Sequence, residues 1–558
     1  MLVGIDVGGT FTDGIIMENG LVLASSKEPT DEENLKNSLL KVLDNLLKEV
    51  LPEQIKRVVL STTLVTNVLA TGQGERTALV LMPGHGLPHD SYDICPDLYF
   101  LSGSIDFRGK EIEPPVRQEM ADVAEKLKAS GIKKIAVAGK FSNRNNQHER
   151  IVASFLREKI PQAEVFKSSD ISGKLNFLRR ATTAYYTAMT SEKWNRFVDE
   201  IAEAIRFRGI KGEIHILKAD GGTIPLEFSR NRPCETIFSG PAASTMGGLA
   251  LSGGNHNSVV IDIGGTTTDI ALIIGGNPLY ASKGAHIQNH YTHINSFAVR
   301  SVALGGDSEI WWEGENLKIG PQRLGVAACF GGECATLTDA FNHYLDLNLG
   351  RPEASEAALG RLVAQAGIRD LSKKAVDQAV SQLVSLIVDM FREWENEPAY
   401  RVWEVVNKRK FKVDQIIGIG AAAAHIVPRV AQAMGVDYFL HEYSPLANAL
   451  GAAVVRPTLA VDLHVDTEKN LFTKSPGGVQ GQLENRHRLQ LEDVKKLAWQ
   501  HLQEVSRERN MEEYAGDYSY YLEEQFNVIR GWERSGKIFD VGIQIAPGFI
   551  KEFEGVKI

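Results

Sequence analysis

Cysteine is scarce in this sequence, with four residues in 558. So few cysteines exclude the dense disulfide framework of small secreted domains. Cys329 and Cys334 are separated by four residues, and no second cysteine pair lies near them in the sequence to complete a zinc site. We therefore expect the cysteines to be buried free thiols.

Long apolar runs and an excess of positive charge are also missing. No stretch approaches the roughly 18 uninterrupted apolar residues of a membrane-spanning helix. The sequence contains 61 Lys and Arg residues and 70 Asp and Glu residues, so its net charge is −9. A negative net charge gives no basis for binding nucleic acid or an acidic membrane. Apolar residues begin at Leu2 and leave no room for a signal peptide. We expect a cytoplasmic protein without nucleic-acid or membrane partners.

Three common catalytic motifs are absent as well. The sequence has no P-loop (G-x-x-x-x-G-K-[ST]), no H-E-x-x-H and no G-x-S-x-G. A nucleotide site would therefore have to use other loops. His286, His290 and His293 could bind a metal or supply a base, although such a group is more often polar surface or satisfied core. His148-Glu149 could be an acid–base pair or only part of a helix cap.

The most informative feature that is present is an internal repeat. Residues Asp6–Asp13 read DVGGTFTD and residues Asp262–Asp269 read DIGGTTTD, with six of eight positions identical. Both copies follow an apolar run, and the turn dipeptides Asn19-Gly20 and Gly275-Gly276 lie at the same offset beyond them. Each copy predicts a strand, a Gly-Gly-Thr turn and a second strand that ends in a two-residue turn.

The residue types of both turns suit phosphate and Mg²⁺. Glycines let backbone N–H groups approach an anion, and threonine hydroxyls add donors without charge. A carboxylate at the end of a strand suits Mg²⁺, which prefers a few carboxylates, water and phosphate oxygens. A tight hairpin stabilised by its own Asp and Thr residues is the alternative for either copy. Because a hairpin does not require both aspartates twice, the repeat favours two loops that hold a polyphosphate from opposite sides.

Strand and helix patterns alternate through the rest of the chain. Spacing of apolar residues predicts helices over 38–51, 116–130, 371–394, 421–434 and 491–505. Short apolar runs predict strands over 58–60, 77–81, 134–138, 214–217, 415–420 and 539–545. The alternation predicts an α/β fold with helices covering the sheets. The length suffices for about three or four domains, and residues 477–481 suggest a linker.

In order and spacing, the two loops and the glycine turn near residue 418 resemble the actin, hexokinase and heat-shock chaperone ATPase superfamily. This resemblance implies two ribonuclease-H-like lobes with a cleft for ATP and Mg²⁺ between them. Asp6 and Asp262 would act on Mg²⁺, and Asp13 or Asp269 would orient the attacking group. The implied nucleotide-binding residues are Gly8, Gly9, Thr10 and Thr12 in the first loop, Gly264, Gly265, Thr266 and Thr267 in the second, and Gly418, Gly420 and Ala421 in an adenosine loop.

A closer resemblance is to the hydantoinase A and 5-oxoprolinase family, which also looks like the ATP-using subunits of acetone and acetophenone carboxylases. Besides the two loops, it is carried by Thr62-Thr63 with Thr66-Asn67, by Phe141-Ser142 with His148-Glu149-Arg150, and by Ser239–Ala243. The resemblance covers residues 1 to about 455. It implies an N-terminal lobe over 1–190, a hydantoinase A-type lobe over 191–455 and a small α+β module appended over 456–558. Substrate contacts would come from Thr62, Thr63, Asn67, Ser142 and His148.

Members of this family use ATP to activate a carbonyl or amide oxygen by phosphorylation. The resemblance therefore implies ATP-dependent hydrolysis of a cyclic amide of the hydantoin or 5-oxoproline type, with a B-type partner subunit or a homo-oligomer. The alternatives are the ATP-using subunit of a ketone carboxylase and a nucleotide-switched activator of a partner protein. The segment Leu304–Ser308 departs from the family pattern, because Asp307 stands where we expect glycine.

Overall fold

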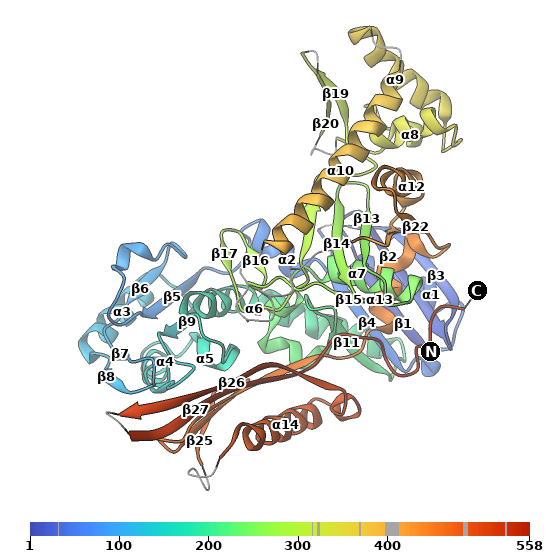
Figure 1. Ribbon diagram of the computed structural model, residues 1–558. Helices are drawn as coiled ribbons and strands as arrows, with labels where there is room; N and C mark the ends of the chain where they lie inside the picture. The colour runs from blue at the N-terminus through green and yellow to red at the C-terminus, as the bar shows by residue number, and fades with distance from the viewer. Residues whose placement is uncertain are drawn as a thin grey trace.

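The protein has a mixed α/β fold with parallel and antiparallel sheets (Figure 1). The computed structural model describes residues 1–557 except for 32, 315, 321–323, 368–369, 397–411, 484–488 and 531–532. None of the helices in this described part is long and apolar enough to cross a membrane. All four cysteines are free thiols, as expected, and Cys234 and Cys329 are buried.

The first copy of the repeat lies in a six-stranded sheet. Its hairpin pairs β1 antiparallel with β2, and β1 pairs in parallel with β4, which in turn pairs in parallel with β11. In spatial order the strands are β12 (Thr223–Pro225), β11 (Glu213–Leu217), β4 (Arg57–Thr62), β1 (Leu2–Val7), β2 (Phe11–Glu18) and β3 (Leu21–Pro29). Helix α1 (Leu35–Leu46) packs on this sheet and ends before residue 51, so the expected helix was too long.

The second copy begins another six-stranded sheet with the same local pattern. Strand β13 pairs antiparallel with β14 and in parallel with β21, as β1 does with β2 and β4. The strands are β15 (Asn277–Pro278), β14 (Thr268–Ile274), β13 (Ser258–Ile263), β21 (Gln415–Ile419) and β22 (Asp437–Phe439), with β18 (Val299–Val302) also paired to β14. Helix α12 (Ala423–Met434) packs against β21.

Two helices rich in small residues join the two sheets. A Cβ added to Gly4 of β1 would overlap the backbone of α13 (Ala447–Val454), and one added to Gly247 of α7 (Ser239–Ser252) would overlap Ala447. On its other side α7 contacts Val260 of β13 through Gly248. Glycine and alanine therefore let the backbones of β1, α13, α7 and β13 stack at close distance.

A third sheet is fully parallel and lies beside the first. Its strands are β10 (Glu164–Lys167), β9 (Lys134–Gly139), β5 (Thr77–Met82) and β6 (Leu98–Phe100). Helices α3 (Arg117–Ala129) and α4 (Gln147–Lys159) pack on one face. The long helix α6 (Phe177–Phe207) covers the other face, and α2 (Leu64–Ala70) and α5 (Ser168–Ile171) lie against it. Helix α6 was not predicted from the sequence.

An arm of three helices and one hairpin projects from the second sheet (Figure 1). Its longest member is α10 (Leu371–Glu395), which confirms the helix expected over 371–394. The arm consists of β19 (Ile310–Glu313), β20 (Asn316–Ile319), α8 (Leu337–Leu345), α9 (Pro352–Ala366) and α10. Two further hairpins, β7 (Ser104–Ile105) with β8 (Glu111–Glu113) and β16 (His286–Ile287) with β17 (His290–Tyr291), lie outside the large sheets.

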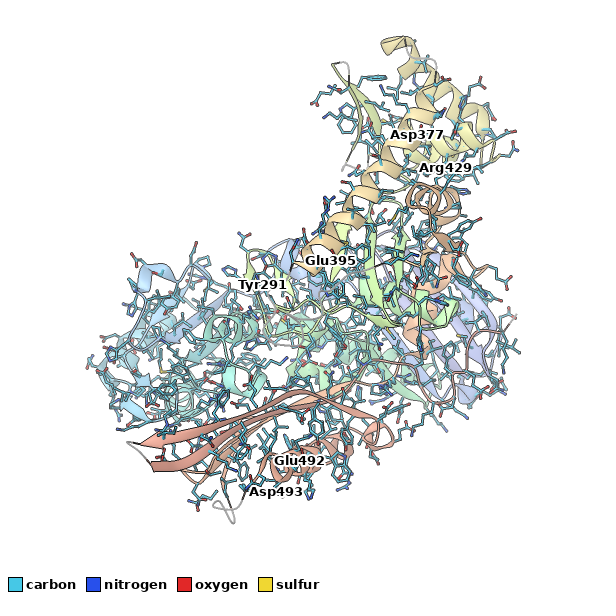
Figure 2. The ribbon with its side chains drawn as sticks, in the orientation of Figure 1. Tyr291, Asp377, Glu395, Arg429, Glu492 and Asp493 are labelled. Carbon is cyan, nitrogen blue, oxygen red and sulfur yellow. The ribbon has the colours of Figure 1, made fainter. Side chains whose placement is uncertain are left out.

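The C-terminal part forms an antiparallel sheet along the side of the molecule opposite the arm (Figure 1). Its strands are β25 (Val479–Gln482), β24 (Leu471–Ser475), β23 (Leu459–Asp466), β27 (Glu533–Ile545) and β26 (Tyr518–Arg530). Helix α14 (Leu491–Glu508) packs on it, with Glu492 and Asp493 in its exposed first turn (Figure 2). The linker expected at 477–481 was wrong, because Val479–Gln482 pairs with β24 as a hairpin strand.

Candidate functional site

The repeat places two pairs of aspartates at the turn ends of its hairpins. Asp6 and Asp13 are cross-strand partners in β1 and β2, and Asp262 and Asp269 are partners at the same register in β13 and β14. Residues at paired positions of an antiparallel hairpin point to the same face of the sheet. Each hairpin therefore presents two neighbouring carboxylates beside its Gly-Gly-Thr turn.

One asparagine connects the two hairpins. Nδ2 of Asn448, at the start of α13, donates to Oδ2 of Asp6 and to Oδ2 of Asp262, each at 3.2 Å. The hydroxyl of Ser244 on α7 also donates to Oδ2 of Asp262. The close stacking of α13 and α7 against both sheets is what allows a side chain as short as asparagine to reach both carboxylates.

The two glycine turns face each other. A Cβ added to Gly265 would lie 3.8 Å from the hydroxyl of Thr10, so the second turn adjoins the first. Both turns close in the same way, with Gly8 N donating to Phe11 O and Gly264 N donating to Thr267 O. The added Cβ at Gly265 would also lie 2.9 Å from Oδ2 of Asp307. Three loops thus converge around the aspartates, since the segment with Asp307 packs on the second turn.

The loop after β21 approaches Asp262 closely. Gly420 has a φ of 84°, and a Cβ there would lie 2.7 Å from Oδ1 of Asp262 and 2.5 Å from the Ile263 carbonyl. Glycine is therefore required at this position, because the positive φ disfavours other residues and because a side chain would clash with Asp262 and Ile263. Gly418 differs, because a Cβ there would overlap the apolar side chains of Leu440 and Val427.

Burial governs the charge state of the four carboxylates. It raises the pKa of Asp6 and of Asp262, with hydrogen bonds from Asn448 opposing the rise in both. It raises the pKa of Asp13 to about 6 against the charge of Lys27. Burial and the negative charge of Asp262 raise the pKa of Asp269 to about 7. Desolvation disfavours the charged form of a carboxyl group, so a cation in this site would be strongly favoured.

The two hairpins differ in how the outer aspartate is neutralised. Asp13 accepts two hydrogen bonds from Nζ of Lys27, at 2.7 and 2.9 Å. At the equivalent register, Asp269 lies opposite Ser301 of β18, and no cationic group of the described residues is within 4 Å of its carboxylate. Oδ1 of Asp269 is buried and accepts no hydrogen bond from the described residues, and the same holds for Oδ1 of Asp6.

A groove of about 680 Å³ opens beside the second hairpin. It is bordered by Ser301, by Pro241 at the start of α7, and by Phe238, whose φ of 57° is unusual for a bulky residue. Its other walls carry Arg300 and Tyr291, so it is partly basic and partly aromatic. Its size lies within the range of small-molecule sites, about 300–1,000 Å³.

Family models match most of the chain. The hydantoinase/oxoprolinase N-terminal region matches residues 2–160, and the hydantoinase/oxoprolinase model matches residues 180–460. The chain belongs to the hydantoinase/oxoprolinase family.

Named relatives in this family are larger enzymes. The caprolactamase subunit alpha of Pseudomonas jessenii is 26% identical, with 77% of this chain and 67% of the relative covered. The 5-oxoprolinase of Saccharomyces cerevisiae is 25% identical, with 80% of this chain and 40% of the relative covered. The chain thus spans about two thirds or less of the length of the curated relatives that it matches first.

The fold is also that of a solved enzyme. The nucleotide-free structure of acetone carboxylase, from work on ATP-dependent acetone carboxylation, matches with a TM-score of 0.70 at 19% identity. The match covers 100% of this chain and 88% of that one. At this identity the likeness establishes the shared fold and nothing more.

The threonines of the hydantoinase/oxoprolinase pattern lie at different distances from the aspartates. Thr62 ends β4 next to β1, and its backbone N–H and carbonyl both bond to the hydroxyl of Ser239 on α7. Asn67 contacts Thr63. Thr66 accepts a hydrogen bond from the Phe238 N–H, which connects this loop to the groove. The hydroxyl of Thr12 contacts the hydroxyl of Thr30, and the N–H of Thr30 donates to the carbonyl of Thr10 in the first Gly-Gly-Thr turn.

Ser142 and His148 lie in a different place from the aspartates. Both follow β9 of the parallel sheet, where His148 bonds to Glu111 at 2.8 Å and Ser142 contacts Ser168. Glu149 does not contact His148 through a hydrogen bond but accepts hydrogen bonds from Gly139 N, Ser168 Oγ and Ser169 N. Among the described residues, Ser142 and His148 do not bond to the four aspartates, and His148 and Glu149 bond to other residues rather than to each other.

The three histidines do not form a metal site. His293 bonds to Ser172, His290 bonds to the Asp93 carbonyl, and the ring of His286 lies tilted against that of Tyr291. Among the described residues, no group of three His, Cys, Asp or Glu side chains could hold a metal ion. An Mg²⁺ site in this family member would therefore rest on two carboxylates with water and phosphate, as is usual for this ion.

Four residues of the site were missed by sequence reasoning. Asn448 begins a helix of small residues, but neither its hydrogen bonds to the aspartates nor that of Ser244 has a local sequence signal. Lys27 and Asp307 were also missed as site residues. Asp307 was noticed only as a departure from the family pattern, although that departure marks the loop on the second glycine turn.

Proposed function

We propose that this protein is an ATP- and Mg²⁺-dependent enzyme that phosphorylates an amide or carbonyl oxygen, leading to hydrolysis of a cyclic amide. The observation that carries this proposal is the Asn448 bridge between Asp6 and Asp262, each beside a Gly-Gly-Thr turn. Membership of the hydantoinase/oxoprolinase family and the names of its relatives, a caprolactamase and a 5-oxoprolinase, supply the substrate class.

The donor set fits Mg²⁺ with a polyphosphate. Asp6 and Asp262 are buried carboxylates of raised pKa, and Oδ1 of Asp6 has no hydrogen-bond partner among the described residues. We infer that Asp6 and Asp262 hold Mg²⁺, directly or through water. When bound, this ion would neutralise charge that develops on the transferring phosphoryl group.

The glycine turns fit the phosphates of ATP. A Cβ at Gly9 would meet no atom within 4 Å, so a ligand can approach the backbone there. We propose that Gly8, Gly9, Thr10 and Thr12 contact phosphate from one side. Gly264, Gly265, Thr266 and Thr267 would contact it from the other, and Gly418, Gly420 and Ala421 would line the adenosine. The approach of Gly420 to Asp262 supports the last assignment more strongly than the packing of Gly418 does.

The difference between the outer aspartates divides their roles. Asp269 has no cationic partner among the described residues and a pKa of about 7, which suits a group that accepts a proton near neutral pH. We propose that Asp269 accepts the proton of the attacking water. Asp13, paired with Lys27, would instead fix the position of the first turn.

The chemistry can be balanced with these groups. The amide oxygen would form a bond to the γ-phosphorus while the bond to ADP breaks, which turns the oxygen into a good leaving group. Water would then add to the amide carbon, with its proton going to Asp269, and the C–N bond would break as the nitrogen takes up that proton, which leaves an acyl phosphate. A second water would hydrolyse the acyl phosphate to the carboxylate and free phosphate. The groove bordered by Ser301 and Phe238 would hold the cyclic amide, with Thr62, Thr63 and Asn67 at its edge. Ser142 and His148 would act only through a substrate that extends towards the parallel sheet.

The finer architecture belongs to the same proposal. We propose two ribonuclease-H-like lobes, 1–190 and 191–455, with the nucleotide between them, and an appended module over 456–558. The repeated pattern of β1, β2 and β4 in β13, β14 and β21 supports paired lobes. The boundary at residue 190 lies within α6. Strands β11 and β12 come after this boundary in the sequence but belong to the first sheet, so chain segments would cross between the lobes.

A partner is part of the proposal because relatives of this chain are named as subunits, such as the caprolactamase subunit alpha and the acetone carboxylase beta subunit. A B-type subunit would take part in ring opening, and a homo-oligomer is the other arrangement. The acetone carboxylase beta subunit of Xanthobacter autotrophicus, a relative at 24% identity, favours one second candidate, the ATP-using subunit of a ketone carboxylase.

The test is ADP release from Mg-ATP with hydantoin, 5-oxoproline or caprolactam, and separately with acetone plus bicarbonate. Stimulation by a cyclic amide without bicarbonate supports the hydrolase, and stimulation only by ketone with bicarbonate supports the carboxylase. Asp6→Asn and Asp262→Asn should abolish Mg-ATP turnover. Asp122→Asn, at an exposed carboxylate of α3, is the matched control and should leave turnover unchanged. Equal turnover in all three variants would refute the proposed site.

A further inference from the structure

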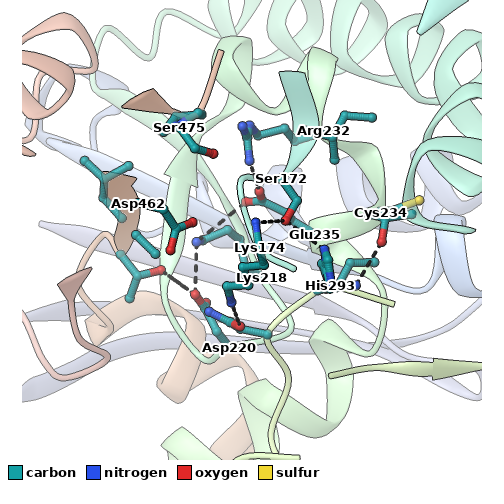
Figure 3. Close-up of a pocket in the computed structure, with 18 of the residues that line it drawn as sticks. Ser172, Lys174, Lys218, Asp220, Arg232, Cys234, Glu235, His293, Asp462 and Ser475 are labelled. Carbon is teal, nitrogen blue, oxygen red and sulfur yellow. Dashed lines mark hydrogen bonds and ion pairs between the residues drawn. The ribbon is translucent and has the colours of Figure 1, made fainter. Parts of the chain in front are cut away.

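A second candidate site is a partly open pocket of about 90 Å³ that is lined by both polar and apolar residues (Figure 3). Its walls come from the α5–α6 connection, from the turn after β11, from the loop around residue 294, and from β23 and β24 of the C-terminal sheet. A water needs roughly 10–15 Å³ of such space, so the cavity holds about six to nine waters or one molecule of about six non-hydrogen atoms.

Charged side chains line this cavity from several elements (Figure 3). Four are cationic and three are carboxylic. They are Lys174, Lys218, Arg232, Arg509, Asp220, Glu235 and Asp462.

In one half of the cavity, the positive and negative charges of the side chains balance each other. Nζ of Lys218 lies 3.0 Å from Oδ2 of Asp220 and 3.7 Å from Oε2 of Glu235. Arg232 donates to the other oxygen of Glu235 at 2.7 Å, and Thr458 donates to both oxygens of Asp220. These two cations and two carboxylates satisfy one another, so they form a fixed wall.

The other half is not balanced. Nζ of Lys174 donates to the amide oxygen of Asn295 at 2.9 Å and lies over the Tyr521 ring. Over the described residues, no carboxylate comes within 4 Å of the charged group of Lys174 or of Arg509. Burial lowers the pKa of Arg509 to about 10, so it stays charged at neutral pH. Two half-buried cations of this pocket therefore lack a carboxylate within 4 Å among the described residues.

Asp462 supplies a hydrogen-bond acceptor in the same space. Its Oδ1 accepts from the Tyr521 hydroxyl at 2.5 Å, which holds the carboxyl group in place. Burial raises the pKa of Asp462, and the charge of Lys174 opposes the rise, so the two groups act on each other across the cavity. His293 adds no charge, because burial lowers its pKa well below the ordinary value and Ser172 bonds to its ring.

We propose that this cavity binds a small carboxylate that also carries a hydroxyl or amino group, with Lys174 and Arg509 on the carboxylate and Asp462 on the donor group. Charge-assisted hydrogen bonds to a carboxylate are the strong kind, and they would balance the two cations. The cavity volume limits the ligand to acids of about two to four carbons. Lys218 follows β11, which runs parallel with β4 and β1, so the site lies at the same sheet edge as Asp6.

The experiment is titration calorimetry of the full chain with glycolate, glycine, β-alanine and acetate at constant ionic strength. Glycolate or one of the amino acids should bind one per chain and raise the melting temperature with concentration. Lys174→Met and Arg509→Gln should each weaken binding roughly tenfold or more. Asp462→Asn should remove the preference for glycolate over acetate. Lys126→Met, an exposed lysine of α3, is the matched control and should bind as the unaltered protein does.

Several results would overturn the proposal. Absence of both heat and thermal shift with all four acids means that the cavity holds water only. Equal affinity of Lys174→Met, Arg509→Gln and the unaltered protein means that binding occurs elsewhere. Circular dichroism of each variant shows whether it is folded. Lys174→Met and Arg509→Gln test the site independently, so if one of them fails to fold, the other still tests the proposal. The assay uses no ATP, so its outcome is separate from that of the proposed enzyme activity.

Discussion

Asp6 and Asp262 accept hydrogen bonds from the same amide nitrogen, Nδ2 of Asn448, at 3.2 Å each. The two aspartates begin corresponding copies of the repeat, on different six-stranded sheets. A single side chain therefore couples the positions of both carboxylates. A movement that separates the two aspartates would break at least one of these bonds.

Asn448→Ala tests the bridge. Removing the amide leaves two buried carboxylates without their common donor, so we expect Mg-ATP turnover to fall roughly 10²-fold, as on loss of a preorganised donor. Steady-state ADP release at varied Mg²⁺ measures this effect. Asn37→Ala, at an exposed asparagine of α1, is the control. Unchanged turnover in Asn448→Ala would show that the bridge has no catalytic role.

The two outer aspartates should respond differently to the same substitution. Asp269→Asn removes the proposed proton acceptor and should lower turnover by roughly 10²–10⁴-fold. Asp13→Asn should lower it much less, because Asp13 is already paired with Lys27. Turnover of the unaltered protein should rise as the pH passes about 7, where Asp269 ionises. The opposite ranking of the two variants would reverse the assignment of roles.

Asp269 should also make stability depend on pH. Its folded-state pKa of about 7 lies above the unfolded value, so the folded state binds the extra proton between these values. Stability from this group is therefore present at low pH and is lost as the pH rises through about 7. Asp269→Asn should melt higher than the unaltered protein at pH 8, and its advantage should shrink towards pH 4, in thermal unfolding without Mg²⁺. A higher melting temperature of the variant at pH 5 alone would contradict this sign.

Two glycine substitutions separate ligand contact from folding. Gly9→Ala places its Cβ in open space, so we expect normal stability and a raised KM for ATP. Gly420→Ala forces a Cβ into contact with Asp262 and strains a φ of 84°, so the protein should lose more than about 1 kcal/mol of unfolding free energy. Gly360→Ala, in open space within α9, is the control for both. An unchanged KM in Gly9→Ala would remove the first turn from the phosphate site.

The C-terminal sheet depends on a charge cluster with the polar loop after β9. Arg144 donates to both oxygens of Asp540, at 2.6 and 2.9 Å, and His464 also bonds to Asp540. Breaking a buried ion pair from one side costs about 3–5 kcal/mol. We expect Arg144→Met to lower unfolding free energy by roughly that amount and to expose the C-terminal sheet to protease.

Arg150→Met is the matched control for this prediction, because Arg150 is an exposed arginine of α4. It should leave both the unfolding curve and the digestion pattern unchanged. Equal protease resistance of Arg144→Met would mean that apolar packing, rather than the ion pair, holds the C-terminal sheet in place.

Local patterns allowed much of the fold to be predicted. The strands β1, β4, β5, β9, β11 and β21 and the helices α3, α10 and α14 follow from apolar periodicity, which is a property of neighbouring residues. The helix over 38–51 was too long, and 477–481 was wrongly expected to be a linker, because strand pairing with β24 overrides the turn-like composition of that stretch. The long helix α6 was missed, although it spans 31 residues.

The sequence by itself determined the repeat, because glycine, threonine and aspartate at fixed spacing encode a hairpin turn whose chemistry is local. It placed Asp6 beside Asp13 and Asp262 beside Asp269. Only the tertiary structure decided that Asn448 joins the two pairs, that Lys27 neutralises Asp13 while Ser301 faces Asp269, and that four cations meet around one small cavity. These contacts join residues far apart in the chain, and close helix–sheet packing rather than local preference brings them together.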